Sequence, residues 1–476
     1  MSVAAGDRGL LVRAAAAART GRSFDPAPVR MAHLGLGAFH RAHQAWYTDA
    51  SDDRNEWGIR AFTGRSPRAA EELSAQDGLF SLIERSVDGD AVILVDSIVD
   101  AVDGARVDRL VETVAAPTTA IVTLTITEAG YALDAQRRPD VSQTSVAADL
   151  AWLRANLPAS RLDLSAPPRT APARLLAALE ARRRAGSGPI AVVSCDNLPA
   201  NGEVARSGVV ALAELAGTDE TLAYLHDHVS FVTSSIDRIT PKTTDADLDA
   251  VRALTGWVDR AAVVTEPFHD WVLSGEFPAG RPAWERAGAR LVDDIEPFER
   301  RKLWLLNGAH SLLAYAGAAR GHETVAAAIA DPTVRSWVEQ LWSEAVHHLP
   351  GEHLALDAYR AALLERFDNG RIQHLLAQIG QDGTTKLRVR IAPIILAERA
   401  AGRDADAGTR ALGAWVALAL AGRLPADRIG SALPQAAGQG GERSVIALLE
   451  LIDPQLVADP AVVLAVSRAA AEFSTR

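Results

Sequence analysis

Between residues 29 and 265, short apolar runs alternate with longer segments of helical spacing, and this alternation limits the fold more than any other feature. Strands that alternate with helices are typical of βαβ units on a parallel sheet. The expected strands are Val29–Leu34, Trp57–Thr63, Ala91–Val95, Ala120–Thr127, Ile190–Ser194, Val229–Thr233 and Ala262–Thr265. Helices are expected between several of them, for example at Ala173–Ala185 and Gly202–Ala216.

From about Pro297 the pattern changes to long helical segments with little strand signal between them. These are Arg300–Ala316, Thr324–His348, Leu354–Phe367, Ile391–Ala401 and Gly408–Ala421. The stretch Gly275–Pro282 is dense in glycine and proline, which interrupt regular structure, so the domain boundary should lie in it or shortly after it. The sequence therefore predicts an α/β domain over residues 1–287 and a mostly helical substrate or catalytic domain over residues 288–476.

Composition excludes several classes of protein. The 476 residues carry 49 Lys+Arg against 60 Asp+Glu, a net charge of −11, which argues against nucleic acid or an anionic membrane surface as the main partner. Cys195 is the single cysteine, so the chain has no internal disulfide and no four-thiolate zinc site. Nothing approaches the roughly 18 consecutive apolar residues of a membrane span.

The alanine-rich N-terminus is interrupted by Asp7, Arg8 and Arg13, whereas a secretory core needs roughly 7–15 uninterrupted apolar residues. We therefore expect a plain N-terminal helix or arm and a cytoplasmic protein. No apolar surface stripe indicates a partner subunit, so a monomer is expected.

A glycine-rich turn stands where the first expected strand meets the first expected helix. Gly35 and Gly37 would supply a tight turn and let backbone N–H groups approach a pyrophosphate at the helix N-terminus, where Ala38 and Phe39 follow. His40 occupies the position of the usual third glycine, so the fingerprint is incomplete. A plain tight turn is the alternative, but the place at the head of a βαβ pattern favours dinucleotide binding.

The second expected strand ends in Thr63-Gly64-Arg65-Ser66-Pro67-Arg68 and lacks the carboxylate that usually holds the adenosine ribose. Arg65 and Arg68 are compatible with a 2′-phosphate and equally with an ordinary surface loop, so the choice between NAD and NADP stays open. His40 and His43 resemble half a metal site, but no carboxylate stands at ligand spacing, and polar packing near the cofactor is the preferred interpretation.

One helix carries a lysine, an asparagine and a histidine among apolar residues. At about 100° per residue, Asn307 and His310 are neighbours, and Lys302 lies ~80° from His310 and ~140° from Asn307 around the axis. All three can line one side of a cleft, where partial burial would lower the pKa of Lys302 and let it take a proton from an alcohol. The alternative is an amphipathic helix whose lysine reaches water.

Other dehydrogenase chemistries lack their residues here. No tyrosine is followed four residues later by lysine, so the dyad of short-chain reductases is missing, and one cysteine does not support a zinc enzyme. If the chain is a dehydrogenase, lysine is the best remaining base.

Together these segments resemble the zinc-independent, polyol-specific long-chain dehydrogenases, the family of mannitol 2-dehydrogenase and fructuronate reductase. The signature K-x4-N-x2-H begins at Lys302 and is specific. The matching segments keep a consistent order: HLGLGAFHRAHQAWYTD (33–49), TITEAGY (125–131), SCDNLPANG (194–202), DRITP (237–241), EPFHDWVL (266–273), GRPAWERAG (280–288), KLWLLNGAHS (302–311) and ERF…DGTTK (365–386).

The resemblance implies a Rossmann-like domain with a mostly parallel sheet, a helical C-terminal domain, and a role for each matching residue. Lys302 would be the general base in alcohol oxidation and the general acid in ketone reduction. Asn197 and Asn307 would hold the developing alkoxide, and His310 would orient the same oxygen or an adjacent hydroxyl. The resemblance also implies Glu299 near the proton path, Asp237, Lys386 and Gln378 at the polyol site, and no metal. The expected cofactor contacts are Gly35, Gly37, Ala38, Phe39, Arg65, Ser66 and Glu128, with NAD(H) preferred and NADP(H) open.

Two departures bear on the substrate. Gln378 stands where mannitol dehydrogenases tend to have arginine and fructuronate reductases glutamine, whereas Trp304 has an arginine counterpart in fructuronate reductases. The leading hypothesis is a dehydrogenase interconverting a sugar alcohol and its 2-ketose, as mannitol and fructose. The nearest alternative is reduction of fructuronate to mannonate. A catalytically silent dinucleotide sensor is the alternative of another class, and the intact set of Lys302, Asn307, His310 and Asn197 argues against it.

Overall fold

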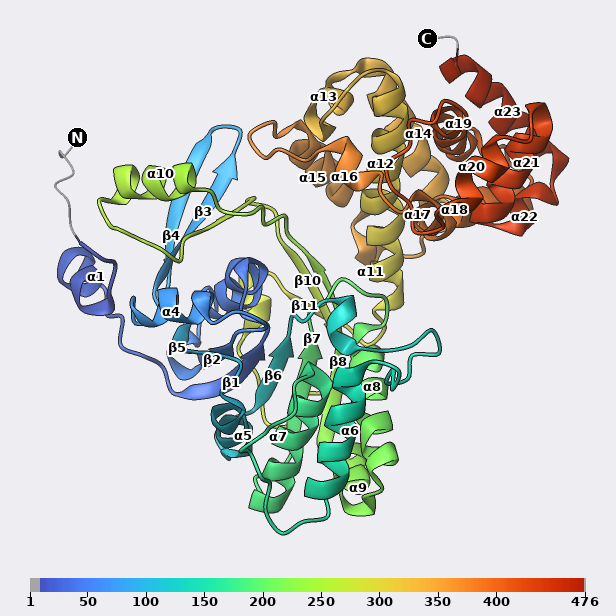
Figure 1. Cartoon of the computed structure of the whole chain (residues 1–476). Coiled ribbons are helices and arrows are strands. Elements are labelled where there is room, and N and C mark those ends of the chain that lie inside the picture. Colours follow the sequence, from blue (N-terminus) through green and yellow to red (C-terminus); the bar gives the residue numbers. More distant parts are fainter. Residues whose placement is uncertain (1–8, 475–476) are drawn as a thin grey trace. The chain divides into compact units, whose positions relative to one another are not determined.

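The computed structural model describes residues 9–474, and the chain divides into two compact units, Met1–Ile295 and Glu296–Arg476 (Figure 1). The expected N-terminal helix is present as α1 (Arg13–Thr20), while residues 1–8 of the expected arm lie outside the described part. Between residues 9 and 474, the structure has no helix long and apolar enough to cross a membrane.

Unit 1 is built on one large sheet whose central strands are parallel, as the alternating sequence pattern predicts. The sheet order is β11-β10-β8-β7-β6-β1-β2-β5, and only the β10–β8 pair is antiparallel. Its strands are β1 (Val29–Leu34), β2 (Gly58–Phe62), β5 (Ile98–Val102), β6 (Ile121–Leu124), β7 (Ile190–Ser194), β8 (Val229–Asp237), β10 (Asp270–Ser274) and β11 (Arg290–Leu291). The Rossmann-like prediction is confirmed.

Both faces of the sheet are covered, which explains why its strands are continuous apolar runs rather than alternating ones. One core cluster joins strand residues such as Val122 and Val192 to helix residues such as Leu110, Leu176 and Val209. The helices of this region are α5 (Val107–Ala115), α6 (Thr144–Asn156), α7 (Ala171–Ala185), α8 (Asn201–Ala216) and α9 (Asp219–His228). A second cluster includes strand residues such as Met31 and Ile121 together with Tyr47, Trp271 and Trp284.

Two of the expected strands do not join the large sheet. β4 (Gly89–Val95) and β9 (Val263–Thr265) flank β3 (Phe80–Ser86) in a separate three-stranded sheet. β3 pairs with β4 as an antiparallel hairpin and with β9 in parallel. Helix α10 (Asp245–Thr255), which begins with a Thr244–Asp247 capping box, packs Val251 into the small core of this sheet. The expectation that these strands extend the parallel sheet is therefore wrong.

Unit 2 is helical, as predicted, and begins with one continuous helical rod of four parts: α11 (Glu296–Arg301), η5 (Lys302–Asn307), α12 (Gly308–Leu312) and η6 (Leu313–Gly317). The expected helix Thr324–His348 is two helices, because Pro332 starts a new one and the Asp331 side chain caps it. The other helices are α13 (Val325–Ala330), α14 (Pro332–Val346), α15 (Leu356–Asp368), α16 (Leu376–Ile379), α17 (Gly383–Arg390), α18 (Ala392–Ala400), α19 (Asp406–Leu420), α20 (Ala432–Ala437), α21 (Gly441–Ile452), α22 (Pro454–Val457) and α23 (Pro460–Ser474).

Candidate functional site

In unit 1, the predicted site residues lie where strands of the large sheet end. The pairs β1–β2, β1–β6, β6–β7 and β7–β8 are parallel, so the carboxyl ends of these strands meet at one edge. The predicted site residues of unit 1 lie at this edge. The Gly35–Phe39 turn follows β1, Arg65 and Ser66 follow β2, and Glu128 follows β6. Asn197 follows β7, and Asp237 is the last residue of β8. Ligands of doubly wound sheets bind outside this edge, where the strand order reverses, here between β1 and β6.

The glycine turn after β1 uses its two glycines for different purposes. Gly35 has φ +107°, and a Cβ there would lie 2.0 Å from the Thr125 carbonyl oxygen, so only glycine fits. Gly37 has an ordinary φ of −143°, and the nearest atom to a Cβ would be the Gly35 oxygen at 3.6 Å. Space is therefore open beside Gly37, at the start of the helix that begins with Ala38. These residues fit a pyrophosphate group, which needs close backbone approach at a helix N-terminus.

His40 occupies the position of the usual third glycine, and its side chain packs against His33 of β1. Its ring stacks on that of His33 with centroids 3.4 Å apart and an interplanar angle of 8°. His33 is fixed by Thr123 Oγ1 at 2.8 Å and Thr125 Oγ1 at 3.0 Å. Burial lowers the pKa of His33 to about 3 and that of His40 well below its usual value, so both rings are neutral.

Arg65 and Arg68, whose role toward a 2′-phosphate the sequence leaves open, lie on the loop after β2. The Arg68 side chain is exposed and its Nε contacts Glu72 Oε1 at 2.7 Å, while its backbone N–H donates to Ser66 Oγ. Arg65 is exposed on the same loop. Because Arg68 already has an anionic partner, Arg65 is the better placed of the two for a 2′-phosphate.

In unit 2, the helix that carries Lys302 is not a regular α-helix. Residues Lys302–Asn307 form a π-helical turn, in which hydrogen bonds close over five residues rather than four. Lys302 and Asn307, five apart, are therefore one turn apart and closer to one face than an α-helical rotation of 100° per residue predicts. Trp342 Nε1 donates to the Leu305 carbonyl at 2.8 Å, which stabilises a carbonyl within the widened turn.

His310, one turn further along, is buried and faces cationic side chains. Its Nε2 atom has no hydrogen-bond partner among residues 9–474. Its ring contacts Phe367 at 5.1 Å and His374 at 4.9 Å between centroids. Burial lowers the pKa of His310 well below its usual value, and His374, Arg366, Arg390 and Lys302 add to that effect. The imidazole is therefore neutral, and its Nε2 atom is a buried polar atom without a hydrogen bond to any described residue.

The other predicted site residues of unit 2 are Lys386, Glu299 and Gln378, and they lie outside the π-helical turn. Lys386, on α17, donates from Nζ to the Ile379 carbonyl at 2.9 Å, and burial lowers the pKa of its ammonium. On the same helix, Arg390 lies 3.5 Å from the Asn307 carbonyl and 3.4 Å from Ser311 Oγ. Glu299 precedes Lys302 by one helical turn and is part-buried, whereas Gln378 on α16 is exposed.

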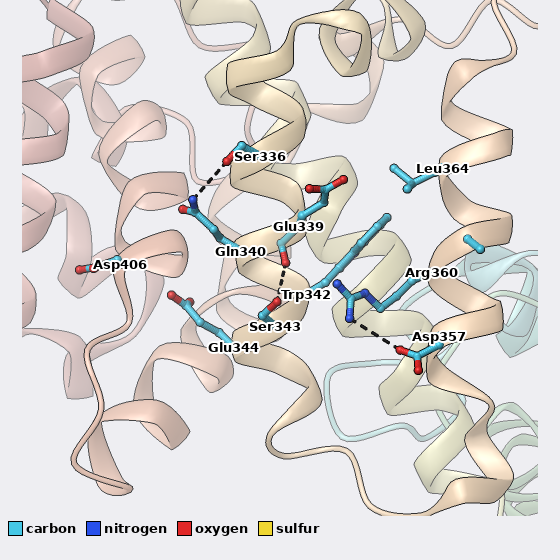
Figure 2. Close-up of a pocket in the computed structure, with 11 residues that line it drawn as sticks. Ser336, Glu339, Gln340, Trp342, Ser343, Glu344, Asp357, Arg360, Leu364 and Asp406 are labelled. Atoms are coloured by element: carbon cyan, nitrogen blue, oxygen red, sulfur yellow. Dashed lines mark hydrogen bonds and ion pairs between the residues drawn. The ribbon is translucent and has the colours of Figure 1, made fainter.

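Figure 2 shows a different pocket of unit 2, about 750 Å³ in volume, bordered by α14, α15 and the start of α19. None of the predicted site residues lines it. Its half-buried Glu344 accepts from the Ala407 and Gly408 amides at 2.7 and 3.0 Å and so caps α19, while burial raises its pKa to about 7. Trp342, which lines the pocket, is the residue that also bonds the π-helical turn.

Sequence reasoning missed several residues of these two clusters. His374 and Arg390 beside His310 have no local signature, because they approach the lysine helix from other helices. Sequence reasoning singled out Asn197 in the segment SCDN (194–197) and not its neighbour Asp196. The Asp196 carboxylate accepts hydrogen bonds from the Ile126 and Thr127 amides and from the Tyr131 hydroxyl. A buried acidic residue directly after a parallel strand was the available signal.

Comparison with known proteins agrees with this arrangement. Residues 29–286 match the mannitol dehydrogenase Rossmann domain, and residues 294–471 match the mannitol dehydrogenase C-terminal domain. The chain therefore belongs to the mannitol dehydrogenase family and is an oxidoreductase of the dehydrogenase type.

Named relatives act on several substrates. D-mannonate oxidoreductase of Escherichia coli (strain K12) is 36% identical over 377 residues, covering 76% of this chain and 74% of the relative. D-arabinitol 4-dehydrogenase of Ralstonia nicotianae is 36% identical over 394 residues, covering 81% and 82%. Mannitol 2-dehydrogenase of Pseudomonas fluorescens, solved as a ternary complex with NAD and D-mannitol, has a TM-score of 0.76 at 31% identity and covers 98% of this chain and 94% of that one.

Proposed function

We propose that this oxidoreductase interconverts a sugar alcohol and its 2-ketose, of the mannitol and fructose type, with NAD(H) as its preferred cofactor. The observation that carries the proposal is the lysine helix, where Lys302 and Asn307 lie in the π-helical turn, His310 follows in α12, and His310 Nε2 is buried with no partner among the described residues. A dinucleotide sensor would need no such set. The family relationship and the NAD–mannitol complex of a relative support the same conclusion.

The cofactor would be held by the carboxyl edge of the large sheet. Open space beside Gly37 and the N–H groups of Ala38 and Phe39 would receive the pyrophosphate, and Glu128 lies on the adjoining loop after β6. Arg65 and Ser66 would face the adenosine end. A bound nicotinamide would supply the hydride acceptor in alcohol oxidation and the hydride donor in ketone reduction.

Proton transfer would be the work of this chain's own residues. Lys302, acting as a general base, would take the hydroxyl proton during oxidation and return it to the ketone oxygen during reduction. Asn197 and Asn307 would donate amide hydrogen bonds to that oxygen as negative charge develops on it. The free His310 nitrogen would orient the same oxygen or its neighbour, and Glu299 would pass the proton toward solvent.

Asp237, Lys386 and Gln378 would bind the remaining hydroxyl groups, with no metal needed. One observation favours a second candidate, the reduction of fructuronate to mannonate. Arg366, Arg390 and Lys302 lie close enough to His310 to help lower its pKa, and these cationic side chains would also suit a substrate carboxylate. A relative that is 36% identical is a D-mannonate oxidoreductase.

The test is turnover of D-fructose and D-fructuronate by the purified protein with NADH and NADPH separately, followed by loss of nicotinamide absorbance. We expect fructose to be reduced, with NADH faster than NADPH. Turnover of fructuronate alone would replace the leading proposal with the second one. Dinucleotide binding without turnover of any ketose or uronate would contradict both and support a sensor.

A further inference from the structure

The loop that follows β6 holds a residue in a backbone conformation that its side chain disfavours. Thr127 has φ +66° and ψ 162°, a region occupied almost only by glycine, and threonine is β-branched. Such a conformation costs on the order of 1–3 kcal/mol and persists only where neighbouring groups impose it. Thr127, Glu128 and Ala129 are exposed, so the strained backbone does not serve to bury a side chain.

A single carboxylate imposes this conformation. Asp196 Oδ1 accepts from the Thr127 amide at 2.7 Å, and Oδ2 accepts from the Ile126 amide at 3.2 Å and from the Tyr131 hydroxyl at 2.8 Å. The Tyr131 hydroxyl is also 2.6 Å from Ser194 Oγ. Asp196 is buried, with 7% of its surface exposed, and both carboxylate oxygens are used. Two consecutive amides directed at one carboxylate form a strong, geometrically specific contact.

The strained loop lies between the glycine turn and the predicted substrate residue Asn197. On one side, Thr125 Oγ1 donates to the Gly35 carbonyl at 2.9 Å, and the Thr125 backbone oxygen is the atom that excludes a Cβ at Gly35. On the other side, Asn197 directly follows Asp196, whose own carbonyl is bonded by Asn201 Nδ2 at 2.8 Å. Because β1, β6 and β7 are adjacent and parallel, these contacts cross the point where a dinucleotide would bind.

We propose that Asp196 is a positioning residue that holds the loop of residues 125–128 against the glycine turn and thereby sets the affinity for the nicotinamide dinucleotide. The proposal rests on the proposed function, because it assumes that the cofactor binds at this edge. Asp196 would not touch the reacting atoms. Its carboxylate would fix the backbone that presents Glu128 on one side and Asn197 on the other before the cofactor arrives, which lowers the ordering cost of binding.

Unit 1 contains a matched control for the chemistry of this contact. Asp149, also buried, accepts from the consecutive Arg169 and Thr170 amides at 2.8 and 2.7 Å. It lies on α6 and bonds the segment that leads into α7, rather than a loop at a strand's carboxyl end. Asp149→Asn and Asp196→Asn each replace one of two accepting oxygens by an amide group, so each leaves a backbone N–H without its acceptor.

The experiment compares the dissociation constant for NADH, measured by fluorescence titration, in the wild type and the two variants, together with the thermal midpoint. We expect both variants to lose thermal stability to a similar degree, but only Asp196→Asn to weaken NADH binding, by about tenfold. Tyr131→Phe, which removes one bond to the same carboxylate, should weaken it by about threefold and keeps the test decisive if Asp196→Asn does not fold.

The double variant Asp196→Asn with Thr127→Gly separates positioning from stability. Glycine adopts the required φ without strain, so the thermal midpoint should recover while NADH binding stays weak. Unchanged NADH affinity in Asp196→Asn or, if that variant does not fold, in Tyr131→Phe would overturn the inference, as would equal weakening by Asp149→Asn. A wild-type protein that binds neither NADH nor NADPH would instead contradict the proposed function, and this inference would fall with it.

Discussion

The two units present their predicted functional groups in different ways. In unit 1, these residues end a strand or lie in the loop or short helix that follows one, and parallel strands collect residues from 35 to 237 at one edge. In unit 2, the central three lie within nine residues of one helical rod, from Lys302 to His310. A sheet edge gathers groups that are far apart in sequence, whereas a helix must adjust its own geometry to align groups that are close together.

The backbone adjustments differ accordingly. Unit 1 uses single residues with positive φ, namely Gly35 and the strained Thr127, each opposed by an atom of another strand's loop. The helix of unit 2 that carries Lys302 keeps helical dihedral angles and widens into a π-turn at Lys302–Asn307. In unit 1, Thr127 is held by the Asp196 carboxylate, which accepts a hydrogen bond from its backbone amide. In unit 2, burial and the nearby cationic side chains of Arg366, Arg390 and Lys302 keep His310 neutral. This contrast suits a division of labour between dinucleotide binding and proton transfer.

The largest expected effect concerns the two glycines of unit 1. Gly35→Ala should destabilise unit 1 by at least ~4 kcal/mol, because its Cβ would overlap the Thr125 oxygen and its φ is disfavoured. Gly37→Ala should fold normally and lose NADH affinity, since its Cβ occupies the open space beside the turn. Chemical denaturation and NADH titration measure the two quantities. Equal behaviour of the two variants would show that the glycines do not have separate purposes.

Part of the fold could be predicted from the sequence, and particular residues show why the rest could not. Val29–Leu34 and Ile190–Ser194 are found to the residue, because strands buried on both faces are uninterrupted apolar runs. The hairpin strand Phe80–Ser86 was missed although Asp88-Gly89 beside it is a turn signal. The expected strand at Ala120–Thr127 ends at Leu124. The Thr125 amide still bonds to Leu34 of β1, but the amides of Ile126 and Thr127 bond to Asp196 instead of a strand.

The candidate site, like the fold, has features that the sequence predicts and features that it does not. Lys302, Asn307 and His310 were predicted from a local pattern and do lie together on one helical rod. The π-turn was not predicted, since four- and five-residue hydrogen bonding share one apolar pattern, and the Trp342 donor to Leu305 comes from another helix. His374 and Arg390 make their contacts across long sequence separations, which a single sequence does not reveal, whereas Asp196 has the signal of an acidic residue just after a parallel strand.

A second prediction sharpens the role of the buried histidine pair of unit 1. Burial lowers the pKa of His33 from 6.5 to about 3 in the folded protein. As the pH drops below about 6.5, the unfolded chain therefore binds a proton at His33 that the folded protein does not bind, and the free energy of unfolding falls. At pH 5 the loss from this residue is about 2 kcal/mol. His33→Asn should flatten the dependence of unfolding free energy on pH between 7 and 5. An unaltered slope in His33→Asn would refute the assignment.

A third, smaller effect concerns the π-turn of unit 2. Trp342→Phe keeps an aromatic side chain but removes the pyrrole ring with its N–H, so the Leu305 carbonyl loses its donor. The lost bond should cost about 1 kcal/mol of stability, and the lost ring volume at this buried position adds to that cost. Turnover should fall several-fold as Lys302 and Asn307 lose alignment, while NADH affinity stays normal. Trp337→Phe, on the same helix, is the matched control. Normal turnover in Trp342→Phe would mean that the widened turn does not depend on this bond.

The smallest effect is expected at the end of β2. Because Arg68 is paired with Glu72, Arg65→Ala should weaken NADPH by a few-fold and leave NADH unchanged, whereas Arg68→Ala should affect neither. Separate titrations with the two dinucleotides measure this. A similar loss for both dinucleotides would make Arg65 a general cofactor contact rather than a 2′-phosphate contact.

The division of labour between the units is tested most directly by Lys302→Ala, assayed for NADH binding and for ketose reduction in the same preparation. Lys242→Ala, an exposed lysine of unit 1, is the control. The expected result is a kcat at least ~10²-fold lower, the lower range for a lost general acid–base, with a dissociation constant for NADH near that of the wild type. Turnover retained in Lys302→Ala would contradict the assignment of proton transfer to the helical unit.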